Sequence, residues 1–312
     1  MFGDICDVSV DQNGDLLVLD AVTCEVLRFT SSGEYLGKFA GLGSAPGELM
    51  DPMDMTVLSG GGVAIADWDA WGLYFYDSTF VYTGFSGIMP GGSPLALAAG
   101  YDNSVLGFGV QFWSEEELPA GEYFLASWKD SVTETFRYME GLATIEPLSP
   151  EDVSIDFPMV CFDSSSEFEL YAALSTDSTY TIHRFSKSGE EISVLEQNWE
   201  RIQLNPVSED QMKQEAAMNG QEISDDMLYA NAIQGIYCDD LGNVWVRLGT
   251  AQYPIFDVYN SAEELIAVVT VTELLDPLFE LQFEFHEDRV FAWNTNPVDY
   301  PKIIVLENFI YF

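Results

Sequence analysis

The side chains with the greatest chemical potential in this sequence are its carboxylates. Asp and Glu number 52 against 11 Lys and Arg, and there are two His, so the formal net charge is −41 at pH 7. Clustered carboxylate oxygens are the ligands that Ca²⁺ prefers. The candidates for a cation site are Asp67, Asp69, Glu151 and Asp152. The question of whether these residues bind Ca²⁺ stays open, and the sequence indicates no other cofactor.

One acidic stretch, "DQNGDLLVLD" at residues 11–20, could itself be a calcium loop. An EF-hand loop needs a glycine at its sixth position and a bidentate glutamate at its twelfth. Counted from Asp11, the glycine stands fourth and Val22 stands twelfth. Asn13-Gly14 instead matches a tight hairpin turn, because this pair accepts the positive φ angles that two-residue turns require. The sequence therefore predicts a turn between two strands.

Histidine chemistry finds little support in this chain. His183 and His286 lie in separate segments, whereas zinc sites and acid–base pairs usually draw on several histidines. The sequence contains no Gly-x-Ser-x-Gly motif for a nucleophile. It also contains no Walker motif and no Gly-x-Gly-x-x-Gly motif for binding phosphate. Enzymatic activity stays uncertain, and we favour a protein that is not an enzyme.

The charge excludes several classes of partner. Nucleic acids and anionic membrane surfaces bind through Lys and Arg, which are scarce here. No apolar run is long enough for a membrane span, and "MFGDICDVSV" at the N-terminus lacks the features of a signal peptide. We expect an extracellular or cell-surface protein whose export signal is missing from this sequence.

The elements that must position these side chains form a repeat. Residues 8–20, "VSVDQNGDLLVLD", align with 236–248, "IYCDDLGNVWVRL", and residues 61–77 align with 14–30 without a gap, placing Asp67 on Asp20. Each unit is predicted to be four short strands joined by tight turns. Six units begin near Ile5, Pro52, Pro94, Pro158, Ala232 and Leu278. A length of about fifty residues per unit is typical of propeller blades.

The sequence therefore predicts an all-β fold, a six-bladed β-propeller with a short helical insertion between blades four and five. We expect a single domain over 1–312, with blades near 2–47, 48–90, 91–145, 155–200, 230–273 and 276–312, and the insertion at 200–230. In the insertion, Ser208 is the expected N-cap with Gln211 three residues on, and Asn219-Gly220 the expected stop.

The segment "GLGSAPGELMDPMDMTV" (41–57), followed by "GGVAIADWDAWGLYFYD" (61–77), resembles the NHL-repeat type of propeller. In that family a Gly-rich stretch and a Pro precede a strand that ends in Asp and an aromatic third strand. The third and sixth units depart from the pattern, with "GYDNSVLGFGV" and "HEDRVFAWN". The chain is also similar to acidic propeller ectodomains of bacterial surface lipoproteins, which implies a surface location.

Long insertions are expected on one face of the propeller, the face of the second-to-third-strand and inter-blade connections. They cover 112–123, 140–158 and 198–232, and loops of this length are usually functional or disordered. Exposed aromatic residues there could stack on a sugar or anchor a peptide. The ligand-binding candidates are Trp113, Glu115, Glu116, Glu117, Tyr123, Trp199 and Tyr229. The alternative, that the insertions only cap the central channel, stays open.

Two cysteines of the first blade are expected near the same face. Cys6 begins the first strand and Cys24 lies in the loop after the second. A Cys6–Cys24 disulfide is geometrically conceivable and would suit an exported protein. Cys161 and Cys238, on different blades, are expected to be buried free thiols.

These observations favour an extracellular binding module that meets a protein, peptide or glycan partner on the insertion face. We expect a monomer. The alternative is a metal-dependent hydrolase or lyase that uses carboxylates near the central channel. Sequence alone does not identify the ligand, because propellers host many unrelated functions.

Overall fold

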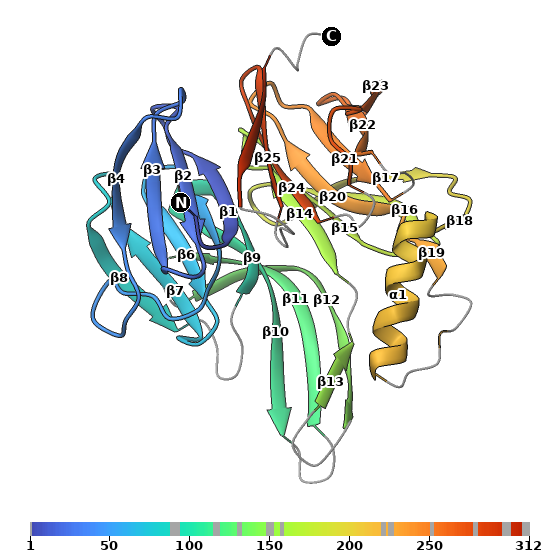
Figure 1. Cartoon of the computed structure of the whole chain (residues 1–312), viewed down its shortest axis with the longest axis horizontal. Coiled ribbons are helices and arrows are strands. Elements are labelled where there is room, and N and C mark those ends of the chain that lie inside the picture. Colours follow the sequence, from blue (N-terminus) through green and yellow to red (C-terminus); the bar gives the residue numbers. More distant parts are fainter. Residues whose placement is uncertain are drawn as a thin grey trace. The chain divides into compact units, whose positions relative to one another are not determined.

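The computed structural model describes most of the chain. The described residues are 2–87, 94–114, 119–129, 133–147, 153–156, 159–219, 223, 228–249, 253–276, 280–294 and 301–307. They fold as a six-bladed β-propeller with mainly antiparallel strands. A helix follows the fourth blade (Figure 1). The fold class predicted from the sequence is therefore confirmed.

The chain divides into two compact units. Unit 1 is Met1–Phe157 with Phe291–Val305, and unit 2 is Pro158–Val290 with Leu306–Phe312. No helix among the described residues is long and apolar enough to span a membrane.

Unit 1 begins with two four-stranded sheets. The first sheet, β1-β2-β3-β4, comprises Ile5–Val10, Leu16–Asp20, Glu25–Phe29 and Tyr35–Ala40. The second sheet, β5-β6-β7-β8, comprises Pro52–Val57, Val63–Asp67, Gly72–Tyr76 and Tyr82–Gly87. Buried strands such as Leu16–Asp20 and Val63–Asp67 are apolar on both faces because each sheet packs against a neighbour.

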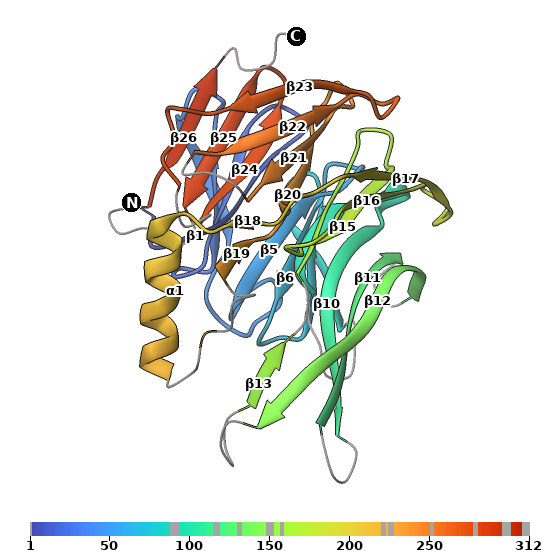
Figure 2. The same cartoon turned by 90° about the vertical axis from the view of Figure 1, so that its right-hand side faces the viewer.

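The third sheet, β13-β12-β11-β10-β9, is larger than expected. Its strands are β9 (Pro94–Ala99), β10 (Val105–Ser114), β11 (Pro119–Lys129), β12 (Thr133–Pro147) and β13 (Val153–Asp156), with a 3₁₀ turn at Tyr101–Asn103. Pairing of β10 with β11 continues to Ser114 and Pro119, well past the end of β9. The expected loops at 112–123 and 140–158 are therefore wrong in part, because much of both segments is paired strand (Figures 1 and 2).

Unit 2 holds the fourth and fifth blade sheets. One is β14-β15-β16-β17, comprising Val160–Ser164, Leu170–Leu174, Tyr180–Phe185 and Glu191–Gln197. The other is β20-β21-β22-β23, comprising Ile233–Cys238, Val244–Leu248, Ile255–Tyr259 and Leu265–Thr270. The last blade sheet, β24-β25-β26, comprises Leu281–His286, Arg289–Asn294 and Ile303–Glu307.

The predicted turn at Asn13-Gly14 is confirmed. Gly14 has φ 78°, and the Asp11 carboxylate accepts the backbone N–H groups of Asn13 at 2.8 Å and Asp15 at 3.0 Å. The carboxylate thus stabilises the hairpin that joins β1 and β2.

The insertion between blades four and five contains α1 (Pro206–Asn219) and a two-stranded sheet, β18 (Ile202–Gln203) with β19 (Tyr229–Ala230). The Asn205 side chain accepts the N–H groups of Val207 at 3.0 Å and Ser208 at 3.1 Å. Asn205 is therefore the N-cap and Pro206 the first helical residue, an arrangement that helices favour. The prediction that Ser208 caps the helix is wrong.

Candidate functional site

Several predicted site residues lie where the structure gives no side-chain detail. Trp113 belongs to β10 and stands opposite Ala120 in the strand register. Five of the predicted site residues lie outside the described part of the chain: Glu115, Glu116, Glu117, Glu151 and Asp152. These residues remain sequence-based candidates.

Tyr123 is a packing residue. Its side chain is 9% exposed, and its ring lies 6.5 Å from that of Phe108. Its hydroxyl occupies the space that a side chain at Gly141 would need. It offers little surface to a ligand.

Trp199 and Tyr229 are partly buried in unit 2, and different residues hold them. The Trp199 indole lies 6.1 Å from the Tyr180 ring, and its Nε1 is buried without a hydrogen-bond partner. Arg201 stacks on Tyr229 at 4.0 Å and pairs with Asp177. Trp199 packs the insertion against the core of the fourth and fifth blades, and Tyr229 lies under Arg201, which ties the insertion to the fourth blade.

Asp67 is a loop anchor. It is fully buried, and its carboxylate accepts the backbone N–H groups of Met50 at 2.7 Å, Asp51 at 3.3 Å and Ala70 at 2.9 Å. A carboxylate that accepts several backbone amides is satisfied without a metal. Asp69 is exposed two residues further on.

Asp20 does the same in the first blade. It accepts the N–H groups of Gly3 at 2.6 Å, Val22 at 3.0 Å and Thr23 at 3.1 Å. The sequence alignment of Asp20 with Asp67 thus reflects a shared structural role. Among the described residues, no three His, Cys, Asp or Glu side chains form a group that could hold a metal ion.

The expected Cys6–Cys24 disulfide is absent from the structure, in which both cysteines are free. The Cys6 thiol donates to the Leu19 carbonyl at 3.4 Å, and the Cys24 thiol donates to the Ala21 carbonyl at 3.5 Å. Cys161 and Cys238 are free as expected. Burial raises the pKa of the Cys161 thiol to about 12, so that group is protonated at neutral pH.

Carboxylates on the first strands of the blades were missed by the sequence analysis. In unit 1 the side chains of Asp7 and Asp54 hydrogen-bond each other, and Asp54 also accepts the N–H of Leu97 at 2.6 Å. In unit 2 Asp163 accepts the N–H of Cys238 at 2.8 Å. These residues connect the first strand of one blade to the first strand of the next.

Burial dominates the acidity of these groups. It raises the pKa of Asp7 to about 7 and the pKa of Asp163 to about 6. The pKa of Asp54 is raised well above its usual range by burial and then by the neighbouring Asp7 charge. Two carboxyl groups in contact share a proton, because both cannot ionise at little cost.

An exposed aromatic residue of unit 1 lies outside the predicted site, on the loop between β6 and β7. Trp71 is 50% exposed and has φ 54°, a left-handed conformation that is unfavourable for a bulky residue. Its counterpart in the repeat, Cys24, has φ 53° and is 1% exposed. The two loops thus share a backbone shape but turn their side chains to opposite environments.

Further exposed groups lie near the loop that carries Trp71. Phe85 is also exposed, and its ring crosses Gly72, where a Cβ atom would lie 2.7 Å from the Phe85 Cζ. Met50, exposed in turn, is held beside the loop through the shared anchor Asp67. We name this surface the Trp71 patch and define it as Met50, Asp51, Asp69, Trp71 and Phe85.

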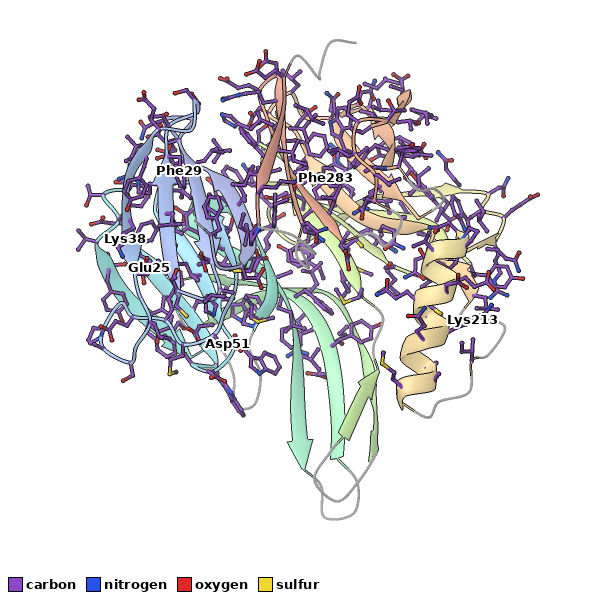
Figure 3. All side chains as sticks on the ribbon, in the orientation of Figure 1. Glu25, Phe29, Lys38, Asp51, Lys213 and Phe283 are labelled. Atoms are coloured by element: carbon purple, nitrogen blue, oxygen red, sulfur yellow. The ribbon has the colours of Figure 1, made fainter. Side chains whose placement is uncertain are left out.

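The patch has an acidic border. Asp51, labelled in Figure 3, lies just before β5. Its pKa is raised by partial burial and then by the negative charges of Asp69 and Asp67. A cationic group placed here would relieve this repulsion and could also stack on the Trp71 indole. In the ungapped repeat alignment Trp71 stands opposite Cys24, a difference that could have drawn attention to this loop but does not show which residue is exposed.

Comparison with protein families and with curated proteins finds no relative. No protein-family model matches the chain, and no curated protein matches it. The resemblance to NHL repeats therefore stays a prediction.

Solved structures do match. A protein from Bacteroides fragilis described as exported aligns with a TM-score of 0.53 at 13% identity, over 94% of this chain and 80% of its own. A virginiamycin B lyase from Staphylococcus aureus aligns with a TM-score of 0.46 at 10% identity, over 91% and 75%. Regucalcin, a calcium-binding protein from Agrobacterium tumefaciens, aligns with a TM-score of 0.47 at 12% identity, over 95% and 85%. At 13% identity the likeness to the B. fragilis protein shows the fold alone.

Proposed function

We propose that this protein is an extracellular binding module and that the Trp71 patch of unit 1 contacts its partner. The observation that carries the proposal is the exposure of Trp71 at a left-handed backbone position. Glycine would fit such a position without steric cost. A half-exposed tryptophan contributes little to folding there, whereas exposed tryptophans dominate many binding surfaces.

The border of the patch indicates the chemistry of the partner. Asp51 and Asp69 favour a group with positive charge, and the rings of Trp71 and Phe85 favour an apolar or planar surface. A protein or peptide segment with Lys or Arg beside an apolar residue meets both requirements. A glycan would use the rings alone.

An outside location fits the proposal. The similar fold of a B. fragilis protein described as exported supports it, as does the acidic composition that keeps a secreted protein soluble by self-repulsion. The metal-dependent hydrolase or lyase is less well supported. Asp54 and Asp163, the inner-strand carboxylates that would serve it, each accept a backbone amide.

The test is selection of ligands on the whole chain. A random peptide library and a glycan array are probed with the wild-type protein and with Trp71→Gly. We expect peptide ligands that contain basic residues and bind Trp71→Gly at least about tenfold more weakly, the loss usual for a central aromatic anchor. The proposal would be contradicted if every selected ligand bound Trp71→Gly as tightly as the wild-type protein. Selected ligands are then titrated against a protein that lacks residues 207–228, which decides between the Trp71 patch and the predicted site on the insertion.

The same variant tests whether Trp71 matters for folding. Glycine relieves the left-handed strain but loosens the unfolded chain, so we expect the free energy of unfolding to change by about 1 kcal/mol or less. Phe80 is the matched control, since it also has a positive φ, 64°, but stacks on Phe39 at 4.9 Å and under Arg28 at 4.0 Å. Phe80→Gly should cost about 2 kcal/mol of stability because it removes packed surface, and it should leave ligand binding unchanged.

A further inference from the structure

A narrow pocket of unit 2 lies between the sheets of the fourth and fifth blades. Its volume is about 290 Å³, including the part open to solvent. The apolar wall consists of Ile182, Leu195, Val244 and Tyr259. Most of this space is open to solvent, so the pocket suits the end of one aliphatic side chain better than a whole cofactor.

The rim of the pocket is polar and fixed. Arg184 bonds to Glu169, with 2.6 Å between Nη2 and Oε2, and to Glu263, with 3.1 Å between Nη1 and Oε1. Ser193 donates to the same Glu263 carboxylate. The guanidinium is therefore held in place before any ligand arrives, and such preorganisation lowers the entropic cost of binding.

An open strand edge borders this pocket. β17 is the outermost strand of its sheet, and no strand in the described part of the chain pairs with its outer edge (Figure 2). Ser193 and Leu195 line the pocket, whereas Ile192 and Val194 are exposed. This alternation is the normal one for a strand. A strand added beside β17 would place every second side chain over the pocket.

Charge indicates what kind of strand could be added. Glu190, Glu191 and Glu196 are exposed along β17 and the turn before it. They outnumber the exposed Lys187 of the same turn, and Glu191 also contacts His183. A second copy of this chain would bring another −41 charges to the contact, which repulsion opposes. A basic segment would instead be attracted and correctly oriented.

We propose that β17 binds an extended, basic segment of another protein by strand addition, and that the pocket between the fourth and fifth blades takes one aliphatic side chain of that segment. Main-chain hydrogen bonds to the edge would supply affinity, and the pocket would supply specificity. The site lies wholly within unit 2 and does not depend on the Trp71 patch.

The probe is a synthetic peptide, Thr-Lys-Thr-Lys-Leu-Lys-Thr-Lys-Thr, labelled with a fluorophore and titrated with the intact protein by fluorescence polarisation. We expect saturable binding that weakens with added salt. We also expect a peptide with Gly in place of the central Leu, and one with Glu in place of every Lys, to bind at least about tenfold more weakly. No saturable binding at about 1 mM protein, the weakest range in which a specific contact is still measurable, would overturn the proposal.

Two variants of β17 locate the contact. Ser193→Phe fills the pocket and should weaken binding at least about tenfold. Val194→Phe makes a large addition on the opposite face of the same strand and should change binding by less than about twofold. Equal effects of the two variants would contradict the proposal that the pocket takes a side chain of the peptide.

Amide hydrogen exchange of the wild-type protein provides a test that needs no variant. Bound peptide should slow exchange at the outer amides of β17, and protection confined to other strands would overturn the proposal. A concentration-dependent dimer that Ser193→Phe disrupts in the absence of peptide would assign the edge to a second copy, and would equally overturn it.

Discussion

At the scale of single residues, the most unusual chemistry in unit 1 belongs to Asp7 and Asp54. These carboxyl groups hydrogen-bond each other on neighbouring first strands, and burial raises the pKa of Asp7 to about 7. A group whose pKa is higher in the folded than in the unfolded state binds its proton more tightly when folded. Its contribution to stability is therefore complete below the unfolded pKa of about 4 and is lost as the pH rises through about 7.

Asp7→Asn should remove much of this dependence. Between pH 4.5 and pH 8, we expect the wild-type protein to lose about 2 kcal/mol more unfolding free energy than the variant, because one pKa unit corresponds to about 1.4 kcal/mol and the pair is partly exposed. Chemical denaturation at several pH values measures the difference.

Asp69→Asn is the control for general charge repulsion. It changes the net charge by the same amount but alters an exposed side chain. Its stability profile should run parallel to that of the wild type. If Asp7→Asn also runs parallel to the wild type, the two carboxyl groups do not share a proton.

At the scale of elements, the inserted helix contributes little to the core. Of the α1 side chains that the structure describes, Ser208 and Ala216 are buried, while Val207 and Met218 are exposed. Lys213 pairs with Glu209 one turn earlier on the solvent side. The Asn205 cap fixes the start of the helix, and the short β18–β19 pair joins the two ends of the insertion.

Replacement of residues 207–228 by a short Gly-Ser linker should therefore leave the cores of the blades intact. We expect the thermal midpoint to change by less than about 3 °C, the equivalent of about 1 kcal/mol for a chain of this size. Ala216→Arg and Ala217→Arg provide a matched pair, since the first residue is buried and the second exposed. A large loss from the deletion would make α1 part of the core.

Elements that obey local rules could be predicted from sequence, and those set by distant pairing could not. The Asn13-Gly14 turn follows from backbone preferences alone. The strands at 112–114 and 140–147 exist because β10, β11 and β12 continue pairing beyond the ordinary length of a blade, and nothing in their composition announces it. The helix start was misplaced because Ser208 matched a capping box, whereas Asn205-Pro206 gave a stronger combination of cap and first-turn proline.

In the candidate site too, local features could be predicted from sequence and features set by distant contacts could not. Asp67 was identified from the repeat, but its role as an anchor depends on amides from the segment before β5. Trp71 was overlooked because sequence does not reveal which of two aligned loop residues turns outward. The pocket beside β17 brings Ser193 together with Glu263, seventy residues away in the chain, a proximity that only the packing of two blades creates.

At the scale of the whole molecule, the −41 charge sets how the protein meets ions. The carboxylates of Asp11, Asp20 and Asp67 are already occupied by backbone amides. Cations should therefore act mainly by screening repulsion rather than by entering these loops.

A thermal melt in Ca²⁺ and a second melt in Mg²⁺, at matched ionic strength, should give equal shifts relative to EDTA. A specific calcium site at about a hundred times its dissociation constant would add roughly 2.7 kcal/mol. A rise in calcium alone would place a site among the remaining acidic residues, Asp69, Glu151 and Asp152 included.

The anchoring by Asp20 and Asp67 separates what holds a loop from what the loop displays. Each carboxylate fixes both the segment that enters its blade and the turn that follows its second strand. The residues between anchor and third strand are then free to differ, as Cys24 and Trp71 do on the same backbone shape. Substitutions in the loop after Asp67 can therefore change what the loop binds while the anchored backbone keeps its conformation.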